Sequence, residues 1–124
     1  MEKIYTENAP EAIGPYSQAI KVGNLLFTSG QIAINPATST VNTNDIVGQT
    51  ERICKNISAI LEASGTSFDK VIKTTCFLAD MNDFAAFNEV YARYFISSKP
   101  ARSCVAVKAL PKNVLVEIEV IAEI

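Results

Sequence analysis

The chain has 124 residues, of which 48% are hydrophobic and 19% charged, and its formal net charge is −2. This length and composition are typical of one globular domain with a core of its own, so we treat residues 1–124 as a single domain. No apolar run approaches the ~18 residues that a membrane span needs. The opening residues, MEKIYTENAPEAIGP, lack the apolar segment of a secretory signal, so we expect a cytoplasmic protein without a membrane partner.

Histidine is absent, and the three cysteines, Cys54, Cys76 and Cys104, are far apart in the sequence. This spacing argues against a disulfide framework and against a zinc site. Without histidine, any acid–base catalysis falls to carboxylates, tyrosine, lysine or bound water. Lysine and arginine are scattered and the pI is about 5.1, so we expect no nucleic-acid partner.

In the first half of the chain, residues Ser17–Ile34 predict a β-hairpin that turns at Gly23–Asn24. A helix is predicted over 46–64, where isoleucines and a leucine recur at helical spacing. Asp45 can cap its N-terminus, and Gly65 can end it.

In the second half, the β-branched run Val71–Leu78 predicts a strand, and 82–95 predicts a second helix. An aromatic stripe on this helix is more often core than a stacking surface. The order of the elements indicates an α+β sandwich with both helices on one face of the sheet. The stripe consists of Phe84, Phe87, Tyr91, Tyr94 and Phe95.

Two further β-like runs, 102–108 and 115–124, are joined by 109–113, whose proline and asparagine favour a reversal. We expect the two runs to pair as an antiparallel hairpin. Alternation then places Arg102 and Glu117 on one shared face. The core-facing residues would be Ser103, Val105, Val107, Val116, Ile118, Val120, Ala122 and Ile124.

The face that carries Arg102 and Glu117 is half apolar, because Cys104, Ala106, Leu115 and Ile121 lie on it too. Two helices on the other face would leave it uncovered, so we expect burial against another subunit. A guanidinium and a carboxylate on such a surface suggest a site for a small anion.

Simpler interpretations of these residues stay open. Arg102 could form an ion pair with Glu117 or Glu119, and alternation does not distinguish the two glutamates as the residue that orients a water. Cys104 could be a thiolate activated by Arg102, or a small packing residue. Tyr16 follows a Gly-Pro turn, so its hydroxyl could project from a loop. For Asn88, a solvated position on the second helix is the default interpretation.

Four segments together resemble the RidA/YjgF/UK114 family: AIGPYSQAI, TSGQIAINPAT, VIKTTCFLADMNDFAAFNEVY and PARSCVAVKALPKNVLVEIEVIA. The resemblance covers nearly the whole chain in order. It implies a chorismate-mutase-like α+β fold and a homotrimer with clefts between subunits. The sheet faces that the helices leave open would then form a central barrel.

The resemblance also implies an activity, the hydrolysis of 2-imino acids such as 2-iminobutanoate and 2-iminopropanoate to 2-keto acids and ammonia. Arg102 would bind the substrate carboxylate, and Glu117 rather than Glu119 would hold the attacking water. Backbone groups of Gly30 and Cys104 would bind substrate or water. The cleft would also be lined by Tyr16, Ser29 and Asn88. No metal and no organic cofactor are implied.

Two departures from the family pattern concern loops near the cleft. The stretch YFISSKPARS is a few residues shorter than in many relatives, and Ser39 stands where glycine is usual. Both bear on substrate range more than on reaction type. Two other functions are weighed against the deaminase, a non-catalytic module that binds 2-keto acids or proteins and an endoribonuclease or translation inhibitor. The acidic pI and the lack of histidine disfavour the ribonuclease.

Overall fold

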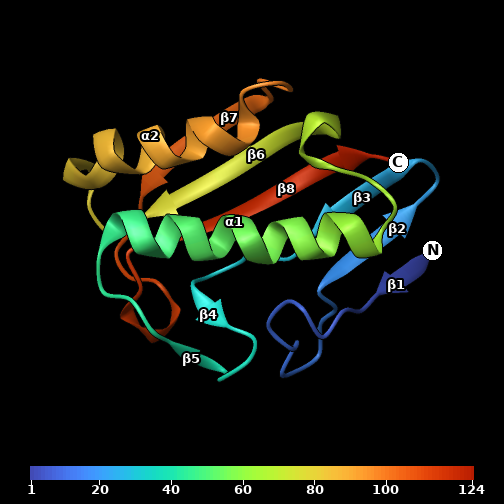
Figure 1. The fold of residues 1–124 in the computed structure, drawn as a ribbon, viewed down its shortest axis with the longest axis horizontal. Coiled ribbons are helices and arrows are strands. Elements are labelled where there is room, and N and C mark those ends of the chain that lie inside the picture. Colours follow the sequence, from blue (N-terminus) through green and yellow to red (C-terminus); the bar gives the residue numbers. More distant parts are fainter.

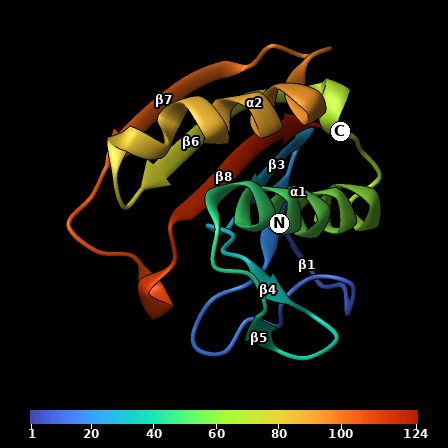
Figure 2. The same ribbon diagram turned by 60° about the vertical axis from the view of Figure 1, so that its left-hand side comes forward.

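The computed structural model describes all 124 residues, which form a six-stranded mixed sheet with both helices on one side (Figures 1 and 2). The strand order is β1-β2-β3-β8-β6-β7, and β4 and β5 pair separately. The strands are β1 (Glu2–Ile4), β2 (Ala19–Val22), β3 (Leu25–Thr28), β4 (Ile34–Asn35), β5 (Thr40–Val41), β6 (Val71–Leu78), β7 (Ala101–Ala106) and β8 (Val116–Glu123), and the helices are α1 (Ile46–Ala63) and α2 (Phe84–Phe95).

Helix α1 begins and ends close to where the sequence predicts. The Asp45 side chain accepts a hydrogen bond from the Gly48 N–H and so satisfies one of the free donors of the first turn. After the helix, Gly65 has a φ of +79°, a conformation that glycine adopts without strain. The isoleucines of one helix face, Ile53, Ile57 and Ile60, are fully buried.

The aromatic stripe of α2 packs into the core, as expected. Phe87 and Phe95 are fully buried or nearly so, and the Tyr91 and Phe95 rings stack with centroids 4.2 Å apart. The Tyr91 hydroxyl is hydrogen-bonded to the Thr74 hydroxyl of β6 at 2.8 Å. Full burial of such aromatic side chains is a large part of what fixes α2 on the sheet.

The predicted C-terminal hairpin is wrong. Strand β7 pairs in parallel with β6 at the edge of the sheet, whereas β8 inserts between β3 and β6, antiparallel to both (Figure 1). A strand that pairs in parallel with β6 must return through a crossover, and α2 supplies it. The first hairpin is confirmed, since β2 and β3 pair antiparallel around Gly23.

The change in pairing also reverses the faces predicted for β7. Arg102 lies beside Thr74 of β6 and Cys104 lies beside Cys76, and both of these neighbours are fully buried. Arg102 and Cys104 therefore point to the helix side of the sheet. For β8 the prediction is confirmed: the buried residues are Val116, Ile118, Val120 and Ala122.

Candidate active site

The site residues expected from the sequence fall into two groups that do not meet within one chain. Four of them line one pocket of about 260 Å³: Tyr16, Ser29, Gly30 and Glu117. The other three, Asn88, Arg102 and Cys104, lie around α2 and the edge strand β7, and a second hollow of about 270 Å³ includes Asn88 and Arg102.

Glu117 belongs to the open face of the sheet, where it lies opposite Phe77 of β6. Burial raises the pKa of its carboxyl above the ordinary glutamate value, and the charge of Glu119 raises it further. A carboxyl whose pKa is raised toward neutrality is suited to take up and return a proton.

The short segment after β3 forms the pocket wall that faces Glu117. The Ser29 hydroxyl donates to the Ser17 carbonyl at 2.5 Å, and the Ser29 N–H donates to the Gln18 carbonyl at 2.9 Å. The N–H and C=O of Gly30 form no hydrogen bond in the chain. Both groups are thus free to bind a ligand in the pocket.

Tyr16 projects from the N-terminal loop, as predicted, with 56% of its surface exposed. Its N–H donates to the Gly14 carbonyl at 2.9 Å, which closes a tight turn. Gly14 has a φ of +129°, and a Cβ there would lie 3.7 Å from the tyrosine ring. The turn therefore sets the direction of the Tyr16 side chain.

Gln18 is a site-forming residue that the sequence reasoning missed. Its side chain is buried, accepts from the Thr6 N–H at 2.7 Å, and donates to the carbonyls of Thr6, Ala9 and Pro10. It thereby ties the N-terminal loop to the start of β2, beside the pocket that it lines itself. A glutamine next to a turn is usually solvated, and no pattern marked its burial.

Arg102 is held by α2 rather than by a carboxylate. Its Nη1 donates to the Asn88 Oδ1 at 2.6 Å, and its guanidinium carbon lies 4.7 Å from the Tyr91 ring centroid and 5.4 Å from that of Phe84. Asn88 is half-exposed, as expected of a solvated helix position, but its side chain also accepts this hydrogen bond from Arg102. Aromatic faces attract a cation without neutralising it, so the guanidinium keeps its charge for an anion.

The ion pair of Arg102 with Glu117 or Glu119 is also wrong within the chain. Arg93, which pairs with Glu51 at 3.1 Å, is the only arginine or lysine with a carboxylate within 4.0 Å. Arg102 lies beside Thr74 of β6 and therefore on the helix side of the sheet. Glu117 lies beside Phe77, three residues further along β6, and therefore on the open side.

Cys104 packs against the core beside Arg102. Burial raises the pKa of its thiol, and the nearby charge of Arg102 opposes that rise. A thiol with a raised pKa is a poor nucleophile at neutral pH, so the geometry favours the packing interpretation. No group of three or more histidine, cysteine, aspartate or glutamate residues is placed to hold a metal ion.

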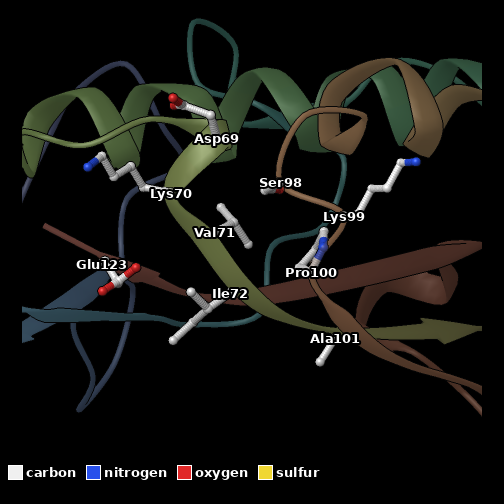
Figure 3. Close-up of a pocket in the computed structure, with 9 residues that line it drawn as sticks. All are labelled: Asp69, Lys70, Val71, Ile72, Ser98, Lys99, Pro100, Ala101 and Glu123. Carbon is white, nitrogen blue, oxygen red and sulfur yellow. The ribbon is translucent and has the colours of Figure 1, made fainter.

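A larger hollow of about 510 Å³ contains none of the expected site residues (Figure 3). It lies where β6 and β7 begin, and its two lysines, Lys70 and Lys99, point in opposite directions. Convergent polar groups mark a binding site better than volume does. The pocket with Glu117 therefore remains the better candidate.

Comparison with known proteins identifies the family of the chain. A protein family described as endoribonuclease L-PSP matches residues 6–124. The chain belongs to this family. This confirms the resemblance to RidA and YjgF proteins drawn from the sequence, and with it the α+β fold.

Members of the RidA family carry several descriptions. A RutC family protein of Pyrococcus horikoshii is 61% identical over 98% of this chain and 96% of its own. Reactive Intermediate Deaminase A of Arabidopsis thaliana is 50% identical over 98% of this chain and 65% of its own. The solved structure of E. coli TdcF with bound serine is 44% identical, with a TM-score of 0.94 over 100% of this chain and 99% of that one. No helix of the present fold is long and apolar enough to cross a membrane.

Proposed function

We propose that the protein is an imine deaminase that hydrolyses 2-iminobutanoate and 2-iminopropanoate, released by pyridoxal-phosphate dehydratases, to 2-keto acids and ammonia. The observation that carries the proposal is the pair of complementary half-sites, an arginine without an acidic partner and a glutamate whose pKa is raised by burial. The deaminase name of the plant relative supports the reaction class, and the serine in the E. coli structure supports a ligand with an α-carboxylate.

Imine hydrolysis needs few catalytic groups from the protein. The imine carbon is already electrophilic, so a positioned water can attack it while Glu117 takes the proton from that water. Glu117 passes this proton to the nitrogen, which gives a carbinolamine. It then takes the hydroxyl proton of the carbinolamine and delivers it to the nitrogen as the carbon–nitrogen bond breaks, so that ammonia leaves and the C=O bond of the keto acid forms. Arg102 holds the carboxylate and fixes the orientation of the imine. Positioning of this kind supplies up to about 7–11 kcal/mol in favourable cases, and acid–base assistance about 10²–10⁴-fold.

The two half-sites require a second copy of the chain. Glu117 and Arg102 face opposite sides of one sheet, so an imino acid that bridges them must take one from each of two subunits. Two exposed features fit such an assembly: the outer edge of β7 is unpaired, and the open sheet face leaves Phe27 and Val105 exposed by 40% and 48%.

The placement of the half-sites also bears on the symmetry. A two-fold dimer joins one self-complementary patch to itself, whereas these half-sites are different surfaces on opposite faces. Their contact is head-to-tail, and a head-to-tail contact that closes gives a ring. The homotrimer that the family resemblance implies is such a ring, with one site at each junction.

The test couples a threonine dehydratase to the purified protein and follows the decay of the imine absorbance. We expect acceleration by the wild type and its loss in Arg102→Ala. If the wild type does not accelerate imine decay, the deaminase function is wrong. Binding of 2-ketobutyrate in calorimetry would then support the non-catalytic carboxylate-binding module. RNA cleavage that co-purifies with the protein and vanishes in Arg102→Ala would instead favour the ribonuclease.

A further inference from the structure

The Glu117 carboxyl group lies directly against the backbone of Gly30. A Cβ at position 30 would lie 2.9 Å from the Glu117 Cδ and 3.2 Å from its Cγ, and it would overlap Oε2. Carbon atoms that are not bonded prefer about 3.5–4.0 Å. Alanine at position 30 and the present Glu117 conformation therefore exclude each other.

Hydrogen bonds hold the backbone on both sides of Gly30. On one side, the Ser29 N–H donates to the Gln18 carbonyl at 2.9 Å. On the other, Gln31 and Ile118 exchange two backbone hydrogen bonds of 2.8 and 3.1 Å. Since both flanking residues are tied to neighbouring segments, an added methyl group must displace the glutamate rather than the loop.

Backbone conformation does not explain the glycine. Gly14, Gly23 and Gly65 have positive φ values, which disfavour any side chain, but Gly30 does not. At Gly23 a Cβ would meet nothing within 4 Å, so only the conformation matters there. At Gly30 the backbone conformation would accept any residue, but a Cβ would clash with Glu117, so the position requires the absence of a side chain.

We propose that Gly30 is a positioning residue: its missing side chain forms the seat that holds the Glu117 carboxyl at the pocket wall. The link to imine hydrolysis rests on the function proposed above, whereas the seat itself rests on packing alone. A displaced Glu117 would turn toward solvent and lose its place beside the free Gly30 N–H and C=O. The site would keep its carboxylate-binding arginine but lose its water-holding group.

A double-mutant cycle tests the seat without reference to activity. We expect Gly30→Ala to lower the melting temperature by about 5 °C in the wild-type background. In the Glu117→Ala background the same change should cost nothing, because the clash is gone and alanine restricts the unfolded chain more than glycine does. Glu117→Gln keeps the size of the side chain without its charge, so the cost should persist there. Glu119→Ala, which removes the neighbouring carboxyl, is the matched control and should also leave the cost unchanged.

Two further readouts link the seat to the site. By carbon-13 NMR, the Glu117 pKa should fall toward the ordinary glutamate value in Gly30→Ala, because the displaced carboxyl is solvated. In the imine assay kcat should fall about 10²-fold with little change in KM, as expected when only the reacting group moves.

The outcomes separate the seat from the function. An equal cost of Gly30→Ala in all four backgrounds, or an unchanged Glu117 pKa, overturns the seat. Should Gly30→Ala fail to fold alone, recovery in Gly30→Ala/Glu117→Ala supports it and continued failure overturns it. If the wild type hydrolyses no imine, the proposed function fails, while the stability cycle still decides the role of Gly30.

Discussion

Arg102 and Glu117 lie on strands β7 and β8, which β6 separates, and they face opposite sides of the sheet. In the proposed mechanism, a single chain therefore presents the group that binds the carboxylate and the group that holds the water to different neighbouring subunits. In a head-to-tail ring each junction combines Arg102 of one subunit with Glu117 of the next. The two residues can therefore be tested in mixed oligomers, in which different subunits carry different substitutions.

Subunit mixing tests the arrangement. Arg102→Ala and Glu117→Gln should each lose about 10²-fold or more in imine hydrolysis. When the two variants are co-expressed with different tags and purified through both, each mixed trimer has one junction with both native residues. We therefore expect about one third of the wild-type activity.

The control is wild type co-expressed with the double variant Arg102→Ala/Glu117→Gln. Mixed trimers with two wild-type chains keep one native junction and those with one wild-type chain keep none, so an equal mixture should give about one sixth of the wild-type activity. If both residues act within one chain, mixing the single variants restores nothing. Sedimentation that finds a stable monomer at micromolar concentration would contradict the ring itself.

The sequence predicted the elements better than their pairing. Alternation in Val116–Glu123 and helical spacing in Ile46–Ala63 are local signals, and the structure confirms both. Which strand pairs with which is decided by long-range packing. The chain does reverse direction at 109–113, but β6 lies between β7 and β8, so the two strands do not pair as a hairpin.

The same limit applied to the site. The resemblance named Arg102 and Glu117, but only the topology shows that one chain keeps them apart. The contact of Asn88 with Arg102 joins a helix to a distant strand, and the burial of Gln18 depends on loop carbonyls that it bonds. Neither contact has a pattern within a sequence window.

Asn88 should set the affinity for the carboxylate rather than the rate. Asn88→Ala removes the hydrogen bond to the guanidinium, so Arg102 must be ordered when the substrate binds. We expect KM to rise about tenfold, equivalent to about 1.4 kcal/mol, with kcat nearly unchanged. Glu89→Ala, on the adjacent exposed position of α2, is the control and should behave as the wild type. A fall in kcat at constant KM would show that Asn88 acts on the chemical step instead.

The pH dependence should follow the ionisation of Glu117. Burial raises its pKa, and the Glu119 charge raises it further. Since the base must be ionised, kcat/KM should fall as the pH drops through this pKa. Glu119→Gln removes the neighbouring charge, which lowers the Glu117 pKa, so the acid limb should move to lower pH. If the acid limb of kcat/KM stays in place in Glu119→Gln, a group other than Glu117 controls it. In that case the limb should also persist in the residual activity of Glu117→Gln.

Gln18 should stabilise the N-terminal loop that carries Tyr16. Gln18→Ala leaves the buried carbonyl of Ala9 and the Thr6 N–H without their partner, which costs about 1–3 kcal/mol in the free energy of unfolding. Urea denaturation measures the loss, and Lys21→Ala on the half-exposed part of β2 is the control. Because the loop is then tied less firmly, limited proteolysis should cut it faster, and the KM for the imine should rise as Tyr16 loses its fixed place. Equal stability of Gln18→Ala and Lys21→Ala would mean that water replaces the lost hydrogen bonds and that the loop is held by other contacts.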